Sequence, residues 1–346
     1  MSDAHQFSIK EPEILLSVIV PVYNVSPYLA ACVNSLLTHL DPRLEVLLID
    51  DGSTDGSDLI CDSLSLKDQR VRVFHKTNEG ASAARNYGIQ KANGKWISFV
   101  DADDYLSRHY FDTFLQYKTD CDWIIFSLSF IDNLGNKEEK IIREEKVYSG
   151  FPEIQAGAYS LMSMDTKCEF LVFTVNKFYK RDIILKHGIR FSEGLSFRED
   201  ELFALNYCLH ANRLRTCSRP LYNYRNHLSG SLSHIKKSTT EYIMFSKELI
   251  RIANALTYYP LAKLEYMRAL DFLLNSYQPD TDKNTLKELC LIIKDLVSKK
   301  SEFLSSLKKV SFLRLLCILP TFILSPILIL YMKHIYRNNL RAENGN

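Results

Sequence analysis

The 346-residue sequence lacks the signals of several protein classes. Its eight cysteines form no Cys-x-x-Cys pair and no zinc-type spacing, so we expect reduced, buried thiols of the kind found in cytoplasmic proteins. No Gly-x-Gly-x-x-Gly follows the first predicted strand, which argues against a nicotinamide-dependent dehydrogenase. The apolar residues 14–22 are too few and wrongly flanked for a signal peptide. No internal repeat or low-complexity segment stands out.

The composition is that of a globular protein, with 46% hydrophobic and 24% charged residues, which excludes disorder, collagen-like repeats and a multi-span membrane protein. The net charge of +2 is unevenly distributed. Residues 294–341 contain nine Lys or Arg against two acids, a balance of +7, and the remainder has 34 basic and 39 acidic residues, a balance of −5. Because the basic segment is also apolar, it predicts a membrane surface as partner and no nucleic acid.

Strand and helix patterns alternate over the first third of the chain. Four apolar runs predict buried strands, at residues 15–22, 44–50, 71–75 and 96–100. Amphipathic segments between them predict helices, the first of them running from Ser26 to about Leu40. Such an order predicts a mostly parallel sheet that binds ligands at the carboxyl ends of its strands.

The pattern changes after Asp122. A further strand is expected at 123–130 and a charged hairpin or flap at 133–150. Helices are expected near 152–164, 176–187 and 199–212, with a pair of short strands at 215–224. Residues 239–309 indicate a helical module with joints at Pro260 and at Gln278-Pro279-Asp280.

Two predicted strands end in acidic residues. Asp50 and Asp51 follow the second strand, and Asp101 and Asp103 follow the fourth. The carboxyl ends of parallel strands share one edge, so the two clusters are expected to lie on the same side. Oxygen donors in this pattern suit Mg²⁺ or Mn²⁺, which would in turn neutralise a diphosphate. The alternative is that these acids only cap helices and begin turns.

Five segments in order resemble glycosyltransferase family 2, whose members have the GT-A fold. They are SVIVPVYN (17–24), LLIDDGSTDGS (47–57), NEGASAARNYGI (78–89), ISFVDADDYL (97–106) and FSEGLSFREDELF (191–203), with PLYNYRNHLSGSLS (220–233) after them. The resemblance covers residues 15–235, about two-thirds of the chain. It implies a Rossmann-like, mostly parallel mixed sheet flanked by helices.

The resemblance also implies a nucleotide-sugar site. The residues carried over to the donor are Pro21, Tyr23, Asn24, Asp51, Asn78, Arg85, Asp101 and Ala102. Pro21, Tyr23 and Asn24 would lie along the base and ribose, and Asp51 would accept a hydrogen bond from a uracil N–H. Asn78 and Arg85 would line the nucleotide pocket, Arg85 either contacting phosphate or simply lying on a helix surface. Asp103 would hold the metal, and Asp101 would contact the ribose, or the metal through water.

Transfer with inversion needs a base for the acceptor hydroxyl, and the resemblance assigns this role to Asp200 and an acceptor-side role to Glu199. The alternative is that these acids form the negative first turn of a helix. Processive members carry Gln-x-x-Arg-Trp after the base, which this sequence lacks, so one sugar per binding event is expected. Arg225 and His227 are candidates for a lid over the diphosphate, or for an ordinary surface loop.

Residues 315–332 contain no charge, and Pro320 and Pro326 interrupt them. Eighteen helical residues span about 27 Å, the lower limit for a membrane crossing. Basic residues flank both ends, which favours a kinked hairpin or an interfacial helix on anionic headgroups, with a soluble docked helix as the alternative. The expected organisation is therefore a transferase domain at 1–235 (donor half 15–120, acceptor half 121–235), a helical module at 236–309 and a membrane-associating tail at 310–346.

These observations predict an inverting, non-processive glycosyltransferase that uses a UDP-sugar and Mg²⁺ or Mn²⁺. A peripheral or hairpin-anchored position on the cytoplasmic face of the cell membrane would bring it to a lipid-linked glycan in surface polysaccharide or lipopolysaccharide assembly. The alternatives are a catalytically silent nucleotide-binding scaffold at the membrane and a sugar nucleotidyltransferase. The latter normally has a Gly-rich loop with Arg or Lys after the first strand, where this chain has Tyr23-Asn24-Val25-Ser26.

Overall fold

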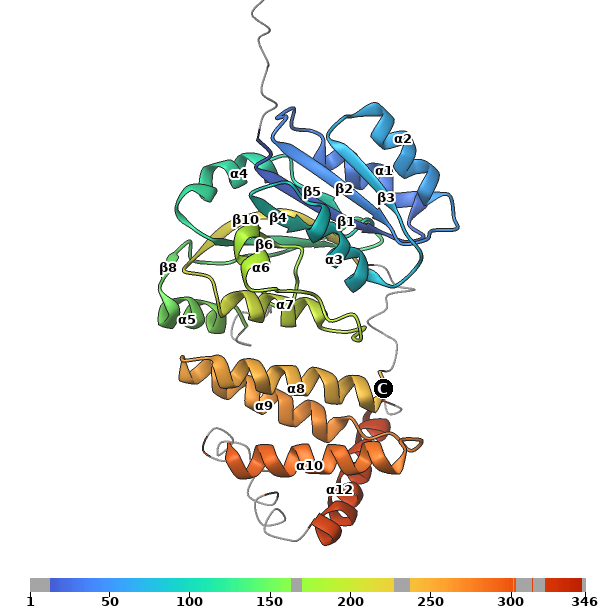
Figure 1. Ribbon diagram of the computed structural model, residues 1–346, viewed down its shortest axis with the longest axis vertical. Helices are drawn as coiled ribbons and strands as arrows, with labels where there is room; N and C mark the ends of the chain where they lie inside the picture. The colour runs from blue at the N-terminus through green and yellow to red at the C-terminus, as the bar shows by residue number, and fades with distance from the viewer. Residues whose placement is uncertain are drawn as a thin grey trace, which may run out of the picture. The chain divides into compact units, whose positions relative to one another are not determined.

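The computed structural model in Figure 1 describes residues 13–162, 170–226, 237–300, 302, 313 and 321–343. The chain forms two compact units that interleave along the sequence. The first unit contains Met1–Val147, Thr174–Arg190 and Arg215–Asn226, and the second contains Tyr148–Phe173, Phe191–Leu214 and His227–Asn346. Neither unit is therefore a continuous segment of the chain.

A mixed sheet forms the centre of the first unit, with the strand order β3-β2-β1-β4-β9-β6-β10-β5. Its strands are β1 (Leu16–Val22), β2 (Leu44–Asp50), β3 (Val71–His75), β4 (Trp96–Phe99), β5 (Tyr105–Leu106), β6 (Trp123–Ile131), β9 (Lys177–Lys180) and β10 (Arg213–Arg225), with β7 (Lys137–Lys140) paired to β6. A tenth strand, β8 (Val147–Ser149), lies off this path. The first four strands are parallel, whereas β9 runs antiparallel to both β4 and β6. The predicted mixed sheet flanked by helices is confirmed.

Helices connect the parallel strands as the alternating pattern predicts. They are α1 (Ser26–Leu36), α2 (Ser57–Lys67) and α3 (Ala81–Lys91), followed later by α4 (Tyr110–Tyr117), a 3₁₀ turn (Lys118–Asp120) and α6 (Arg181–Lys186). Every residue of β2, and every residue of β1 except Pro21, is buried, which explains why both strands are predominantly apolar. Helix α1 ends at Leu36, a turn earlier than expected.

The structure corrects one predicted helix. Residues 176–187 form strand β9 followed by the short helix α6. Phe178 and Tyr179 point to opposite faces of the sheet and are both fully buried. Because β9 lies between β4 and β6, both of its edges are paired, and this setting favours an extended chain whatever the helical period of so short a segment suggests. The two short strands expected at 215–224 are likewise one long strand, β10.

The second unit is helical. Its helices are α5 (Phe151–Met162), α7 (Glu199–Cys208), α8 (Thr239–Ala255), α9 (Tyr259–Asn275), α10 (Lys283–Lys299) and α12 (Thr321–Glu343). Pro260 lies in the first turn of α9, and Asp282 caps α10 after the break at 278–280, so both predicted joints are present. Ser238 and Glu241 form a capping box at the start of α8.

Helix α12 contains Pro326 and packs against α9 and α10, with Leu328 and Met332 buried. The preceding part of the predicted tail, including Pro320, lies outside the described residues. Within the described ranges, no helix combines the length and the hydropathy that a bilayer crossing requires.

Gly88 of α3 allows this helix to lie directly on β1. A Cβ atom added there would stand 2.4 Å from Cγ2 of the fully buried Ile19. We expect Gly88→Ala to destabilise the first unit by about 1–3 kcal/mol through overpacking, despite the better helix propensity of Ala. Urea unfolding followed by the fluorescence of Trp96 and Trp123 would measure it, because both tryptophans belong to this unit. The exposed Gln90→Ala is the control, and an equal midpoint for both variants would refute the packing argument.

Candidate active site

The carboxyl end of β1 carries three of the predicted nucleotide-binding residues. Pro21 pairs with Ile49 of β2, and the side chain of Tyr23 is 49% exposed. Asn24 has a positive φ of 51°, a conformation that Asn adopts more readily than most residues. Its Oδ1 accepts a hydrogen bond from the N–H of Thr54 at 2.8 Å. Asn24 therefore fastens the loop after β1 to the loop after β2, and the ring of Tyr23 is left on the surface beside them.

Asp51 directly follows β2 and is almost completely buried. Its carboxylate accepts hydrogen bonds from Nζ of Lys76 at 2.7 Å and from the backbone N–H groups of Glu79 at 3.1 Å and Gly80 at 2.7 Å. Asp51 thus holds the loop after β3 in place, and with it the exposed Asn78. An ionised carboxylate has about four lone-pair positions, so these three donors still allow it to accept a further hydrogen bond. The contact of Asp51 with a uracil N–H remains a prediction.

Gly52 allows the two loops to approach each other. Its φ is +77°, and a Cβ atom there would lie 3.0 Å from the backbone nitrogen of Asn78 and 3.3 Å from the carbonyl oxygen of Lys76. A side chain at this position would therefore push apart the two loops that carry Asp51 and Asn78.

Asp50 is paired with a histidine that the sequence patterns did not single out. Nδ1 of His75 lies 2.8 Å from Oδ2 of Asp50, and Nε2 of His75 lies 3.1 Å from Oδ1 of Asp62. These hydrogen bonds, that to Asp50 foremost, raise the pKa of His75 above its ordinary value. Asp50 and His75 are opposite each other in the parallel register of β2 and β3, and only strand pairing reveals this.

Arg85 of α3 points inward to Asp101. The guanidinium Nη2 donates a hydrogen bond to Oδ1 of Asp101 at 3.0 Å, and Arg85 is only 5% exposed. This burial excludes the alternative of a solvated arginine on the helix surface. The pair joins α3 to the residue two positions beyond β4, so the two predicted donor residues are in direct contact.

The turn after β4 is held by Tyr222 of β10. The Asp101 N–H donates to the Tyr222 oxygen at 3.1 Å, and the Tyr222 hydroxyl donates to Oδ2 of Asp104 at 2.6 Å. The N–H of Arg225 donates to the other carboxylate oxygen of Asp104 at 2.7 Å. Burial foremost, and then the charges of Asp103 and Asp101, raise the pKa of Asp104 well above its usual range. Asp104 and Tyr222 were not among the predicted site residues, although the run of acids after β4 was a signal for Asp104.

Arg225 lies between two tyrosines at this turn. Its guanidinium carbon is 5.3 Å from the ring centre of Tyr28 and 4.9 Å from that of Tyr105. Burial foremost, and then the charges of Asp104, Asp103 and Asp101, raise the pKa of the Cys32 thiol, whereas the charge of Arg225 lowers it. Arg225 is therefore a second cation, after Arg85, beside the Asp-x-Asp turn. His227, its predicted companion, lies outside the described residues.

The donor set at this turn fits Mg²⁺ or Mn²⁺. Asp101 and Asp103 offer hard carboxylate oxygens from one turn, and Asp103 is half-buried. Over the described part of the chain, no group of three or more His, Cys, Asp or Glu side chains is arranged to hold a metal ion by itself. Mg²⁺ is commonly held by one or two carboxylates together with substrate phosphates and water, so this incomplete set suits an ion that arrives with a diphosphate.

Glu199 and Asp200 belong to the second unit, where they begin helix α7. Both are half-buried. The residue before them, Arg198, is a non-glycine residue in the left-handed conformation, with φ 52°. The third acid of the run, Glu201, is completely buried and so is not part of a solvated negative first turn.

Comparison with known sequences gives consistent matches. A family model described as glycosyl transferase family 2 matches residues 17–175. Glycosyltransferase GlyG of Streptococcus pneumoniae is 30% identical over 297 residues, which cover 81% of this chain and 95% of that protein. The uncharacterized glycosyltransferase EpsJ of Bacillus subtilis is 30% identical over 221 residues, 64% of this chain. The match covers 63% of EpsJ, slightly less than two-thirds of its length.

Comparison with solved structures gives the same fold. The crystal structure of S. aureus TarS 1–349 in complex with UDP-GlcNAc has a TM-score of 0.65 at 20% identity, covering 94% of this chain and 92% of that one. The UDP complex of the same TarS fragment has a TM-score of 0.62 over the same shares.

The contact between His75 and Asp50 should make stability depend on pH. Because the folded pKa of His75 is raised, its contribution to stability is complete below the unfolded pKa of about 6.5 and is lost as the pH rises through the folded value. Replacing His75 with Gln should flatten the pH dependence of the urea midpoint in this window. The His75 ring protons, followed by NMR, should titrate above 6.5, and more closely to it in Asp50→Asn. Titration of His75 at or below 6.5 in the unmodified protein would contradict the assigned contact.

Proposed function

Because the chain belongs to glycosyltransferase family 2 and has the GT-A fold, we propose that it transfers a sugar from a UDP-sugar to an acceptor hydroxyl, with inversion at the anomeric carbon. One observation carries the proposal: the parallel strands β1, β2 and β4 end at one edge, and Tyr23, Asp51 and Asp101 follow them there. An exposed aromatic ring, carboxylates and buried arginine together suit a nucleoside diphosphate.

In this proposal, Pro21, Tyr23 and Asn24 lie along the base and ribose. Asp51 and Asn78 border the uracil, and UDP is favoured among nucleotides because TarS structures of the same fold hold UDP and UDP-GlcNAc. Asp101 and the adjoining Ala102 border the ribose.

The diphosphate is assigned to the cations around the Asp-x-Asp turn. Arg85 orients Asp101 through their hydrogen bond, and Arg225 supplies a further positive charge. Nε of Arg225 is buried, and among the described residues it has no hydrogen-bond acceptor, which suits a contact with phosphate oxygen. Asp103, with Asp101, would hold Mg²⁺ or Mn²⁺, and the ion would supply Lewis-acid support to the departing diphosphate.

Asp200 is the proposed base. Inversion requires the acceptor hydroxyl to attack the anomeric carbon from the face opposite the diphosphate, and an ionised carboxylate takes its proton as the new bond forms. Asp200 lies in the first turn of α7, the end of a helix at which a negative charge is stabilised. Glu199 is proposed to orient the acceptor. The chain lacks Gln-x-x-Arg-Trp, and both of its tryptophans precede Asp200, which supports transfer of one sugar per binding event.

The acceptor is proposed to be a lipid-linked glycan on the cytoplasmic face of the cell membrane, in assembly of a surface polysaccharide or lipopolysaccharide. Support comes from the excess of +7 between residues 294 and 341 together with the uncharged residues 315–332. This combination attracts anionic headgroups and can bury apolar side chains at the interface.

The roles of the acids can be separated by calorimetry and turnover. Asp103→Ala should weaken UDP binding in Mn²⁺ at least about tenfold, because a charge-assisted metal contact to the diphosphate is lost. Asp200→Asn should leave the UDP Kd unchanged but lower the rate of UDP release from UDP-GlcNAc, UDP-glucose or UDP-galactose about 10²–10⁴-fold. Asp112→Asn, an exposed acid of α4, is the control for a lost surface charge.

Equal loss of UDP affinity in both variants would refute the assigned roles. Metal-dependent UDP binding with no release of UDP from any of the three sugars would favour the nucleotide-binding scaffold instead.

Membrane association is tested with the full chain and lipid vesicles. We expect flotation with phosphatidylglycerol vesicles at low salt, weakening at high salt, and no flotation with phosphatidylcholine alone. Lys333→Gln with Arg337→Gln should weaken binding about tenfold or more, since each basic residue near the surface contributes about 1 kcal/mol. Lys67→Gln with Lys186→Gln makes the same change in charge on the first unit. Equal effects of the two pairs would contradict the role of the tail.

A further inference from the structure

Two buried glutamates and two arginines form an ionic cluster between α7 and α9, within the second unit. Glu201 of α7 and Glu265 of α9 are completely buried. Nε of Arg198 donates to Oε2 of Glu201 at 2.6 Å, and Arg268 contacts Glu201 as well as Oε2 of Glu265, the latter at 3.2 Å. The donor and base roles proposed above do not use these four residues.

The surroundings shift the pKa values of the two glutamates in opposite directions. The charges of Arg268 and Arg198 outweigh the effect of burial and lower the pKa of Glu201, which is therefore the carboxylate that balances the arginines. Burial, with the neighbouring charge of Glu201, raises the pKa of Glu265 to about 7 despite Arg268. Around neutral pH, Glu265 therefore holds a proton for part of the time, and Gln resembles its protonated form.

The cluster fixes Arg198, the residue immediately before α7. Arg198 has φ 52°, and its carbonyl oxygen accepts the N–H of Leu202 at 3.2 Å, the first turn of the helix. The guanidinium of Arg198 also lies over the ring of Phe272 on α9, 5.6 Å from its centre. A left-handed conformation costs a non-glycine residue free energy and persists only where its surroundings enforce it. Here Glu201 and α9 supply that enforcement.

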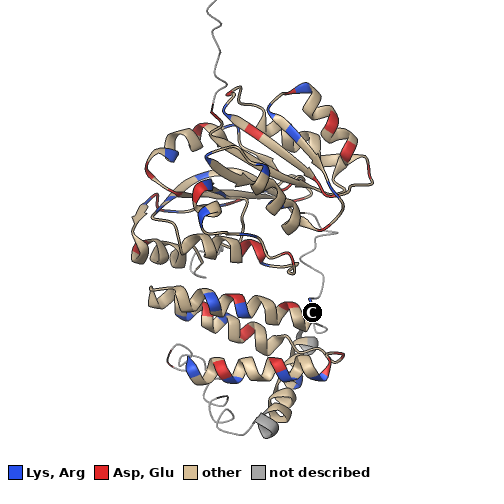
Figure 2. Cartoon of the chain, viewed as in Figure 1, with Lys and Arg blue, Asp and Glu red and all other residues tan. Residues whose placement is uncertain are grey.

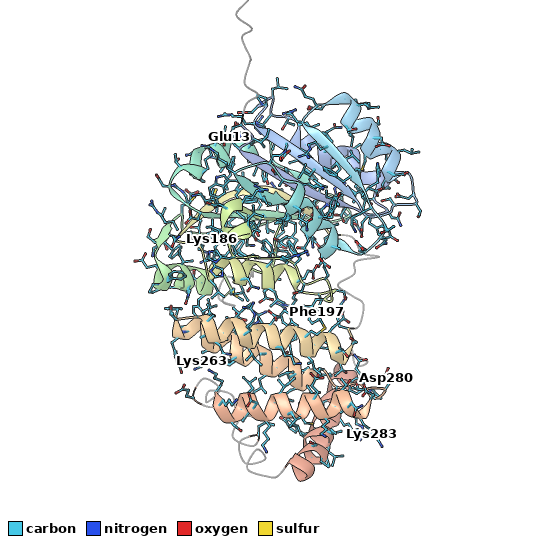
Figure 3. The ribbon with its side chains drawn as sticks, viewed as in Figure 1. Glu13, Lys186, Phe197, Lys263, Asp280 and Lys283 are labelled. Carbon is cyan, nitrogen blue, oxygen red and sulfur yellow. The ribbon has the colours of Figure 1, made fainter. Side chains whose placement is uncertain are left out.

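The segment before α7 is fixed by the same helices. The hydroxyl of Ser196 donates to Oε1 of Glu241 on α8 at 2.6 Å. The ring of Phe197, labelled in Figure 3, lies 5.2 Å from that of Phe245 on α8 and 6.2 Å from that of Phe272 on α9. Residues 196–198 are therefore held from both α8 and α9, immediately before Glu199 and Asp200.

Burying charges is a poor way to gain stability, because desolvation costs about as much as the attraction returns. Charges that are paired with one another do, however, hold their side chains in one arrangement. Successive side chains on a helix point about 100° apart, so drawing Glu201 into the interior fixes the direction of Asp200 beside it.

We propose that Arg268 of α9, acting through Glu201 and Arg198, is a positioning residue that sets the orientation of Asp200. The helices after residue 236 then belong to the catalytic apparatus and are more than a membrane adaptor. This inference depends on the proposed function, in which Asp200 is the base.

The first test is hydrogen exchange on the full-length protein, which does not require activity. Arg268→Gln should speed exchange of the Leu202 to Leu205 amides at least about tenfold, with the amides of α8 unchanged. Glu201→Gln should do the same, whereas Glu265→Gln should have little effect. Tyr266→Phe is the matched control, because it removes a hydrogen bond between α9 and Asn254 of α8 without touching the cluster. Unchanged protection in Arg268→Gln and Glu201→Gln would overturn the proposal.

The second test is UDP release from UDP-GlcNAc in water. Arg268→Gln and Glu201→Gln should lower kcat about 10–100-fold, as misplacement of a catalytic group by about 1 Å does, while the UDP Kd stays within twofold. Arg268→Lys should recover part of kcat, since it restores the positive charge but not the planar guanidinium group. If Arg268→Gln does not fold, Arg268→Lys and Glu201→Gln still decide the question. Equal kcat in Tyr266→Phe and Glu201→Gln would overturn the proposal.

The two hypotheses fail differently. A native protein that neither binds UDP nor releases it from a UDP-sugar contradicts the proposed function, while the exchange measurement still decides whether the cluster positions α7. Normal turnover with unchanged kcat in the cluster variants contradicts the positioning role alone.

Discussion

Repulsion between carboxylates at one edge of the sheet is the constraint on which the first unit depends. The parallel register of β1, β2 and β4 brings Asp50, Asp51 and Asp101 to the same side. Each has a nitrogen-bearing partner from a different element, namely His75 at the end of β3, Lys76 in the loop after it and Arg85 of α3. Each of these contacts also fixes a loop. The interactions that offset the repulsion are therefore the same ones that shape the candidate donor site.

The repulsion on Asp104 is reduced in a different way. It is buried, its pKa is raised, and it is held by the hydroxyl of Tyr222 and the N–H of Arg225. These bonds tie the Asp-x-Asp turn to the carboxyl end of β10.

The second unit contains its own charge balance, in the interior instead of at an edge. Glu201 and Glu265 share Arg198 and Arg268, and the start of α7 is defined by this cluster and by the rings around Phe197. Figure 2 shows acidic and basic residues interspersed along α8, α9 and α10, as expected for helices with a solvated face. A helical module that looks generic in the sequence thus contributes Glu265 and Arg268 to a buried cluster with Glu201, the residue next to Asp200.

The parallel strands, the helices between them and the family could be predicted from the sequence. Apolar runs and short motifs are local signals that can be recognised without knowing which residues they contact. The sequence also placed Tyr23, Asp51, Asp101 and Asp103 at the strand ends and Arg85 on a helix, although the roles assigned to them and to Asp200 remain predictions. The tertiary structure decided the rest. The prediction of a helix at β9 was wrong because only pairing with β4 and β6 favours an extended chain there. His75, Tyr222 and Arg268 gained their importance from partners 25, 118 and 67 positions away, and pairing over such distances is set by packing and strand register, which no local pattern encodes.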